Sequence, residues 1–418
     1  MAVQITTLTW EQLLEFAQNH TPARRIQRPG QLPSTVPVPS GLHKLSPEAP
    51  LSVVLYRDAN SWCPFSERVW FALEEKQIPF VTEFIDLFNK PEWYIERVPS
   101  GLVPAIQIKG KFVSESKDIL LALEAEFTGS PLLPTDPEES AITKQRLEDA
   151  ELGYRFLQGK QNHDQAALRS AFEAKLDELE QALAQYPGAY FFSTFSLVDI
   201  MYAAPLYRLA VSLPIYQNYH IQGNPRFPRL NAWLDALNER PAYQRVKTDA
   251  TTFNRLVQEL WRLEPIADPL PFDPVVSGAM HYRAEAAERL SDNREAAIAD
   301  ILKNSPLKAL SVESKPSIET MIEVHLNIEI HLKLLAAFLL YGDEVLSSWK
   351  RMSQKETPGS FSAAIGAITL AYVRNRICAP RDMSAGAAIA FRSAANQVLS
   401  SIPSYRWHYE KSGTQFFC

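Results

Sequence analysis

The sequence is poor in cysteine and in long apolar runs, and it has no excess of positive charge. Its 418 residues include only three cysteines, a sparse and odd set that argues against a disulfide framework and fits a reducing compartment. The apolar stretch LLAAFLLYG, which starts at Leu334, is well short of the roughly 18 residues that a membrane-spanning helix needs, so we expect it in a core. The net charge of -6 argues against a nucleic-acid partner, because such proteins usually present a basic face.

The N-terminal twenty residues lack the features of a targeting segment. They have no basic start followed by an apolar centre, and Glu11 and Glu15 speak against a transit peptide. We therefore expect a cytoplasmic protein. With 46% hydrophobic and 22% charged residues the chain has the composition of a globular protein, and its length predicts two or three packed units.

Residues 51–127 contain the elements of a small mixed domain. LSVVLYRD from Leu51 predicts a strand, residues 64–76 a helix, and FVTEFIDL from Phe80 a second strand. VPAIQIKGKFVSES predicts a hairpin with its turn at 109–111, and SKDILLALEAEF predicts another helix. The order β-α-β and then β-β-α predicts a small sheet with helices packed on it.

The rest of the chain is predicted to be helical, so the fold class is α/β plus all-α. Residues 1–50 hold a short helix with a capping box at Thr9 and Gln12, then a proline-rich arm. A second domain over 139–263 contains helices expected at 139–158, 164–186, 196–212 and 241–262. The prolines between Pro265 and Pro274 mark a boundary, and 277–418 form an accessory helical domain whose role the sequence leaves open.

Cys63 is the residue with the clearest chemical context. It directly precedes Pro64, which suits the first position of a helix because the missing N–H is not needed there. A helix N-terminus offers N–H donors and a positive dipole end, so we expect a lowered pKa and a thiolate at Cys63. Arg68, one turn further on, adds positive charge unless it is solvated or paired. Ser66 stands where a dithiol motif C-x-x-C has its second cysteine, which points to a small external thiol as co-substrate.

Several short motifs around Cys63 resemble one family. CPFSER at 63–68, NKPEW at 89–93, PSGLVPAI at 99–106 and ESKDIL at 115–120 are similar in order and spacing to motifs of the cytosolic glutathione transferases, specifically the omega-like and dehydroascorbate-reductase-like cysteine members. The resemblance covers about 51–262 and implies a thioredoxin-like N-terminal domain followed by an all-helical domain. In the helical half, Ser196 and Asp199 form an S-x-x-D capping box that resembles the folding motif of that domain.

The resemblance assigns a role to each matching position on the cysteine side of the site. Cys63 would be the catalytic thiol that meets the sulfur of glutathione, with Phe65 among the glutathione-binding residues. Lys90 would contact the glycyl carboxylate of the tripeptide.

The same resemblance assigns roles in the hairpin. The peptide bond between Val103 and Pro104 would be cis, and the bend would expose the backbone of Val103 to the cysteinyl unit of glutathione. Glu115 would accept the α-ammonium group of the ligand. Ser116 and the helix start that it caps would hold the γ-glutamyl carboxylate, as helix N-termini do for anions.

The resemblance, together with a cysteine at the catalytic position, implies a glutathione-dependent thiol transferase or reductase. Cys63 would attack a glutathionylated substrate, and a second glutathione would resolve the mixed disulfide. Glutathionylated proteins, dehydroascorbate and phenacyl-type conjugates are the substrate classes implied. Two alternatives stay open: a non-enzymatic, redox-responsive glutathione-binding or interaction protein, and a glutathionyl-hydroquinone reductase, whose CPWA motif differs from this chain at Phe65 and Ser66.

The remaining candidates carry less chemistry. Glu323, His325, Glu329 and His331 are ligand types, but their spacing does not place both histidines on one helix face, so we expect no metal. We expect Cys378 to be a buried structural cysteine and Cys418 to be exposed. Tyr154, Phe156 and Tyr207 are candidates for a second-substrate pocket, although core packing explains aromatic residues more often. A homodimer is compatible with the sequence, and glutathione is the only co-substrate expected.

Overall fold

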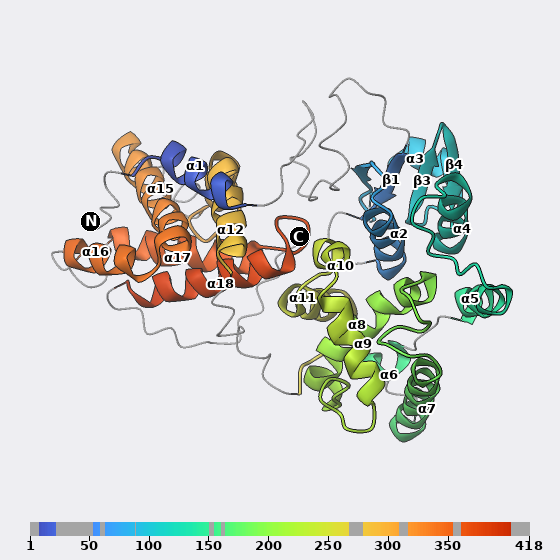
Figure 1. The fold of residues 1–418 in the computed structure, drawn as a ribbon. Coiled ribbons are helices and arrows are strands. Elements are labelled where there is room, and N and C mark those ends of the chain that lie inside the picture. Colours follow the sequence, from blue (N-terminus) through green and yellow to red (C-terminus); the bar gives the residue numbers. More distant parts are fainter. Residues whose placement is uncertain are drawn as a thin grey trace. The chain divides into compact units, whose positions relative to one another are not determined.

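The structure is a computed structural model, and it describes residues 8–21, 53–58, 63–87, 89–149, 154–159, 164–266, 279–308, 317–353 and 361–402. The chain divides into two compact units (Figure 1). One unit contains residues 25–270 together with 379–381, and the other contains residues 1–24, 271–378 and 382–418. The proline-rich arm predicted before residue 51 lies outside the described residues.

A four-stranded sheet with the order β2-β1-β3-β4 begins the first unit. β1 (Val53–Arg57) pairs in parallel with β2 (Val81–Phe84), while β3 (Ala105–Ile108) is antiparallel to both β1 and β4 (Lys111–Ser114). In the register, Tyr56 lies opposite Ala105, and Ala105 lies opposite Ser114. The ends of β1, β2 and β4 and the start of β3 therefore meet at one edge of the sheet.

Helices cover both faces of this sheet. α2 (Pro64–Glu75) and α4 (Ser116–Glu126) pack on the face that carries Val53 and Leu55, in the positions seen in Figure 1. α3 (Glu92–Arg97) packs on the other face, where Tyr94 joins Tyr56 in a smaller apolar cluster. The alternation of side chains along β1 explains the two clusters, because successive residues of a strand point to opposite faces. α3 was not predicted from the sequence.

The helical part of the first unit contains seven helices among the described residues. They are α5 (Pro137–Asp149), α6 (Tyr154–Gln158), α7 (Gln165–Ala184), α8 (Leu197–Gln217), α9 (Pro228–Asn238), α10 (Pro241–Val246) and α11 (Ala250–Trp261). Two predicted helices are therefore wrong in extent. The helix expected at 139–158 is two helices, and the one expected at 241–262 breaks at Lys247, whose backbone is extended, before Asp249 caps α11 by accepting a hydrogen bond from the N–H of Thr252.

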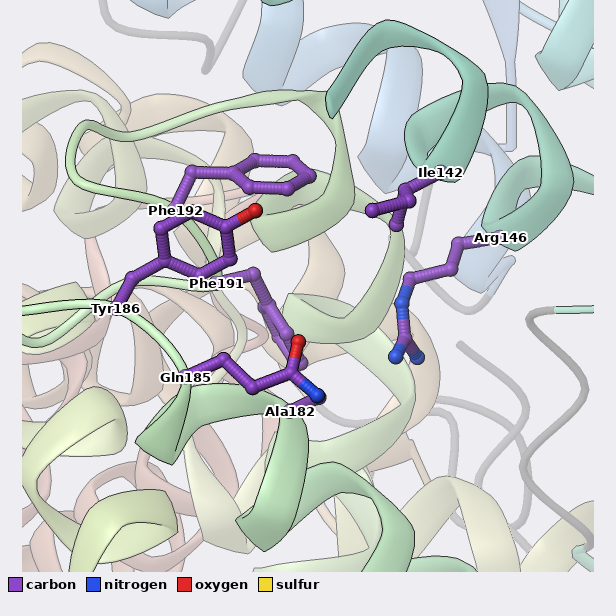
Figure 2. Close-up of a pocket in the computed structure, with 7 residues that line it drawn as sticks. All are labelled: Ile142, Arg146, Ala182, Gln185, Tyr186, Phe191 and Phe192. Atoms are coloured by element: carbon purple, nitrogen blue, oxygen red, sulfur yellow. The ribbon is translucent and has the colours of Figure 1, made fainter. Parts of the chain in front are cut away.

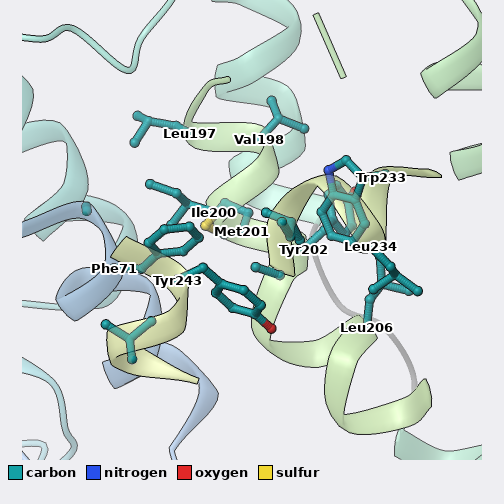
Figure 3. Close-up of a cluster of buried hydrophobic side chains, with 14 of the residues drawn as sticks. Phe71, Leu197, Val198, Ile200, Met201, Tyr202, Leu206, Trp233, Leu234 and Tyr243 are labelled. Carbon is teal, nitrogen blue, oxygen red and sulfur yellow. The ribbon is translucent and has the colours of Figure 1, made fainter. Parts of the chain in front are cut away.

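α8 is the central helix of this part. It is buried along nearly its whole length, and Ser196 and Asp199 form the predicted capping box at its start. Figure 3 shows α8 residues packed against Trp233 of α9, Tyr243 of α10 and Phe71 of α2. The apolar core is thus continuous from the sheet into the helices.

The three acidic side chains of α2 fix that helix to the helical part. Within the described residues, Glu67 pairs with Arg208 of α8 at 2.7 Å and Glu74 pairs with Arg245 of α10 at 2.7 Å. Glu75 pairs with Arg240, which directly precedes α10. Because Cys63 is the N-cap residue of α2, these contacts also help to fix the residue that carries the thiol.

The second unit is all helical in its described part. It contains α1 (Trp10–His20), α12 (Met280–Asp292), α13 (Arg294–Asn304), α15 (Ile318–Tyr341), α16 (Asp343–Ser353), α17 (Phe361–Arg376) and α18 (Ala385–Ser400). The predicted capping box at Thr9 and Gln12 is confirmed at the start of α1.

α15 contains the apolar stretch that the sequence predicts for a core. By length and composition alone this helix would pass as a membrane-spanning segment, but 67% of its apolar window is buried within the structure. Leu334, Leu335 and Leu339 are almost fully buried. The burial is that of a core helix, as predicted.

Candidate active site

The predicted glutathione site is assembled at one edge of the sheet. Cys63 lies between β1 and α2, Lys90 follows β2, Val103 and Pro104 precede β3, and Glu115 follows β4. The strand register brings these connections to the same edge. The sheet topology thus collects residues that are far apart in the sequence. The first of them, Cys63, and the last, Ser116, are separated by 53 positions.

Cys63 occupies the N-cap position of α2, with Pro64 as the first helical residue, as predicted. Its side chain is 9% exposed, and the Sγ atom donates a hydrogen bond to the carbonyl oxygen of Val103 at 3.4 Å. The peptide bond between Val103 and Pro104 is cis, as the resemblance implied. The thiol therefore lies directly beside the backbone expected to meet the cysteinyl unit of glutathione.

The ionisation of Cys63 differs from the prediction. Burial, and then the negative charge of Asp58, raise the pKa of the thiol above its usual value of 9.0. The N–H groups of Phe65 and Ser66 and the Ser66 hydroxyl act in the opposite direction but do not prevail. The prediction of a lowered pKa is wrong, because helix-start donors do not compensate for a buried sulfur next to a carboxylate.

The segment before β3 is held in place by Tyr94. The buried hydroxyl of Tyr94 donates a hydrogen bond to the carbonyl oxygen of Leu102 at 2.7 Å. Gly101 has a φ of +63°, a left-handed conformation that favours glycine. The Nζ atom of Lys90 lies 3.9 Å from the position that a Cβ on Gly101 would occupy. Lys90 thus brings a positive charge to the loop that leads to Val103.

Glu115 and Ser116 form the start of α4. Glu115 has a φ of +67°, which is strained for a residue other than glycine and often marks a functional site. Its side chain is exposed, and its carbonyl oxygen accepts the N–H of Ile119 at 2.9 Å. Ser116 is 8% exposed and is the first residue of the helix, so the prediction that Ser116 caps α4 is wrong: the N-cap residue is Glu115, whose side chain makes no capping hydrogen bond. An exposed carboxylate beside a helix N-terminus suits the two opposite charges at the amino-acid end of glutathione.

Arg68 lies in the interior and not in solvent. Its side chain is 6% exposed, and its Nε atom donates a hydrogen bond to the carbonyl oxygen of Met201 in α8 at 3.1 Å. The guanidinium also lies over the ring of Phe65, 4.9 Å from the ring centroid, and Phe65 itself is 47% exposed. Burial lowers the pKa of Arg68 to about 10, so that it keeps its positive charge at neutral pH.

Asp58 was not predicted as a site residue. It is 3% exposed, directly after β1, and its Oδ1 atom accepts a hydrogen bond from the N–H of Cys63 at 3.4 Å. The signal in the sequence is an aspartate directly after a mostly apolar strand, five residues before the cysteine.

The aromatic candidates for a second-substrate pocket take part in packing. Phe156 is 4% exposed and packs against the rings of Phe172 and Tyr219. Tyr207 meets the ring of Tyr243 edge on, and Tyr154 meets Trp261 in the same way. Core packing therefore accounts for Phe156, while Tyr154 and Tyr207 are partly exposed.

A small pocket lies elsewhere in the helical part (Figure 2). Its lining comes from α5, α7 and the segment after α7, namely Ile142, Arg146, Ala182, Gln185, Tyr186, Phe191 and Phe192. Its volume of about 10 Å³ holds roughly one water molecule, which is too little for a substrate. None of the residues predicted for the glutathione site lines this pocket.

Two of the four ligand-type residues predicted in α15 have structural partners. Glu329 accepts a hydrogen bond from the indole of Trp10 at 3.1 Å, and the buried His331 donates from Nδ1 to the carbonyl oxygen of Asn327 at 2.7 Å. Within the described ranges no three His, Cys, Asp or Glu side chains gather as a metal site. Cys378 is fully buried, as predicted, and Cys418 lies outside the described residues.

Comparison with known proteins identifies the family. A model of the glutathione S-transferase N-terminal domain matches residues 62–126, and one of the glutathione S-transferase C-terminal domain matches residues 162–236. Protein IN2-1 homolog A from Oryza sativa subsp. japonica is 33% identical over 192 residues, which are 45% of this chain and 78% of that protein. Glutathione S-transferase DHAR2 from Arabidopsis thaliana is 31% identical over 186 residues, 44% of this chain and 84% of that protein.

The solved structure of glutathione transferase Omega 3C from Trametes versicolor covers 48% of this chain and 91% of its own, with 29% identity and a TM-score of 0.43. The two family models span the sheet domain and much of the helical part, which are the thioredoxin-like N-terminal domain and the helical C-terminal domain of this family. Neither model reaches the helices after residue 236. The chain belongs to the glutathione S-transferase family.

Proposed function

We propose that the protein is a glutathione-dependent thiol transferase or reductase in which Cys63 forms a mixed disulfide with glutathione. The observation that carries this proposal is the position of the thiol, whose Sγ atom lies 3.4 Å from the carbonyl oxygen of Val103. That carbonyl belongs to the segment before β3, at the sheet edge where Lys90, Glu115 and Ser116 also collect.

Glutathione would lie along this edge with its charges matched. Lys90 pairs with the glycyl carboxylate, and the backbone of Val103 pairs with the central cysteinyl unit. At the other end, Glu115 accepts the α-ammonium group, and Ser116 with the N-terminus of α4 holds the γ-glutamyl carboxylate. Phe65, which is 47% exposed, offers an apolar surface beside the thiol.

The proposed cycle consists of two thiol–disulfide exchanges. In the first, the Cys63 sulfur attacks the glutathione sulfur of a glutathionylated substrate, the substrate leaves as a thiol, and a Cys63–glutathione disulfide forms. In the second, a glutathione thiolate attacks that disulfide, giving oxidised glutathione and a free Cys63. Ser66 takes no part in resolution because it has no thiol. Glutathionylated proteins and small molecules are the substrate class of this cycle. Dehydroascorbate carries no glutathionyl group, so its reduction would take two electrons from the Cys63 thiol and one glutathione, which together become the Cys63–glutathione disulfide that the second exchange resolves. A phenacyl-type conjugate would lose its glutathionyl sulfur to Cys63 and leave as the ketone, protonated at the carbon that carried the sulfur.

The raised pKa of Cys63 shapes the expected kinetics. Only the thiolate attacks a disulfide, and most of Cys63 is protonated at neutral pH because its pKa lies above 9.0. The proton lost by Cys63 balances the proton gained by the departing substrate thiolate. The rate of the first exchange should therefore rise with pH through neutrality.

The same observation supports a second candidate function. A protein that binds glutathione and keeps its thiol buried and protonated would respond to oxidation without rapid turnover. This redox-responsive binding protein has the same fold and the same site, and both candidates fit a cytoplasmic location. The glutathionyl-hydroquinone reductase alternative is less favoured, because Phe65 and Ser66 depart from its motif.

Turnover of a glutathionylated small molecule distinguishes these functions. We would follow the reduction of a glutathione–mercaptoethanol disulfide with excess glutathione, coupled to glutathione reductase, for the native protein and for Cys63→Ala and Cys63→Ser. Cys378→Ser, which changes a thiol fully buried in the other unit, is the matched control. We expect activity in the native protein and the control and only background in both Cys63 variants. Retention on immobilised glutathione without turnover would favour the binding protein, and full turnover by Cys63→Ala would overturn the mechanism.

A further inference from the structure

Asp58 is a buried acidic residue in direct contact with the residue that carries the thiol. It is 3% exposed, and its Oδ1 atom accepts the backbone N–H of Cys63 at 3.4 Å. The contact spans five residues of the chain, from the end of β1 to the cap of α2. None of the family motifs described above includes Asp58.

The neighbour of Asp58 in the sequence fixes its position. Arg57 donates a hydrogen bond from its guanidinium to the carbonyl oxygen of Asp58 at 2.8 Å. The same guanidinium lies over the ring of Trp70 in α2, 4.0 Å from the ring centroid, and is itself buried. The end of β1 is thus attached to the first turns of α2, and the carboxylate of Asp58 lies in the interior beside the backbone of Cys63.

Four titratable or charged groups face the sulfur from the elements packed around it. Asp58 after β1 carries a negative charge, and Arg68 of α2 carries a positive one. Tyr94 of α3 and Tyr154 of α6 interact electrostatically with Cys63 but stay neutral near pH 7, because burial raises the pKa of both. Of these four groups, only Asp58 is negatively charged near pH 7. In a buried site a negative charge opposes the formation of a thiolate.

We propose that Asp58 is a positioning residue for Cys63, whose buried carboxylate holds the residue before α2 and keeps the sulfur in its thiol form in the ligand-free protein. A thiol is far less prone than a thiolate to stepwise oxidation, so this arrangement protects the sulfur between turnovers. The consequence for turnover rests on the proposed function. The effect of Asp58 on the ionisation of the thiol is independent of the proposed function, because it concerns the protein without glutathione.

The pH dependence of alkylation tests this proposal directly. Iodoacetamide reacts with the thiolate, and we would measure its rate between pH 6 and 10 in a parent protein with Cys378→Ser and Cys418→Ser, which leaves Cys63 as its only cysteine. Asp58→Asn removes the charge but keeps an oxygen that can accept the N–H of Cys63. Asp58→Ser is a second variant without the charge, in case the first does not fold. Asp235→Asn, at an exposed position of α9, is the matched control.

We expect the midpoint of the rate profile to fall in Asp58→Asn, with alkylation at pH 7.5 about tenfold faster than in the parent, since one unit of pKa is tenfold in thiolate. Asp235→Asn should behave like the parent. A purely structural role of Asp58 would lower the melting temperature without moving the midpoint downward. A midpoint equal to or above that of the parent, in either folded Asp58 variant, would overturn the proposal. No glutathione is used, so this result is independent of whether the protein turns over a disulfide.

Discussion

Asp199 couples the stability of the helical part to pH. Its carboxylate is fully buried and accepts four hydrogen bonds, from the N–H and hydroxyl of Ser196, the N–H of Phe191 and the indole of Trp233, at 2.8–3.2 Å. Burial nevertheless raises its pKa from 3.8 to about 6, because the charged form loses its hydration and the hydrogen bonds offset only part of that loss. Folding therefore takes up a proton at Asp199 between pH 4 and 6.

The sign and size of the effect follow from linkage. Because the folded pKa is raised, the contribution of Asp199 to stability is complete below about pH 3.8 and is lost as the pH rises through about 6. A shift of roughly two units corresponds to about 3 kcal/mol. In Asp199→Asn the position cannot titrate, so the difference in unfolding free energy between the native protein and the variant should grow by about 2.5 kcal/mol from pH 7 to pH 4, which is less than the full value because pH 4 lies just above the unfolded pKa.

The assay must measure the stability of the helical part of the first unit, because the chain has two compact units and a global signal would report on both. Hydrogen exchange of the α8 amides across a urea series, at pH 4, 5, 6 and 7, gives the free energy of opening of the helix that Asp199 caps. Acid effects from other residues cancel in the comparison with Asp199→Asn. A difference that is constant with pH, or that grows toward pH 7, would refute the reasoning and show that the four hydrogen bonds outweigh burial.

Two further predictions concern packing. Glu67→Ala removes the carboxylate that pairs with the buried Arg208, and we expect the free energy of unfolding to fall by about 3–5 kcal/mol in urea titrations; a loss below 1 kcal/mol would show that the pair is dispensable. Gly366→Ala would place a Cβ 2.1 Å from Nε2 of the buried His331, where α17 meets α15, and should destabilise the second unit by about 1–3 kcal/mol. An unchanged melting temperature would contradict that contact.

The sequence predicted the sheet domain well because its signals are local. The strand before Cys63, the helix that starts at Pro64 and the hairpin around Gly110 all have strong apolar patterns with clear turn residues at their ends. α3 was missed because six residues after Pro91 are too few to show helical periodicity. The break before α11 was missed although the sequence marks it, because the stretch from Lys247 to Thr252 is mostly polar and Asp249 is a preferred N-cap residue.

The candidate site was predictable as a set of residues but not in its electrostatics. The motifs identified Lys90, Glu115 and Ser116 as candidate site residues, and the sheet register brings the segments that contain them to one edge of the sheet. The ionisation of Cys63 depends on how deeply the fold buries the sulfur and on Asp58, which precedes it in the sequence. The position of Cys63 at a helix start depends only on the residues that follow it. From that position alone we predicted a lowered pKa, whereas burial and Asp58 raise the pKa of the thiol.

Trapping the mixed disulfide would show whether Cys63 exchanges disulfides with glutathione. The native protein would be mixed with a glutathionylated small molecule, without free glutathione, quenched with acid and digested for mass spectrometry. The account predicts a glutathione adduct on the peptide that contains Cys63, with release of one equivalent of the small thiol, and removal of the adduct when glutathione is added. An adduct found only on Cys378 or Cys418, or none at all, would contradict the account.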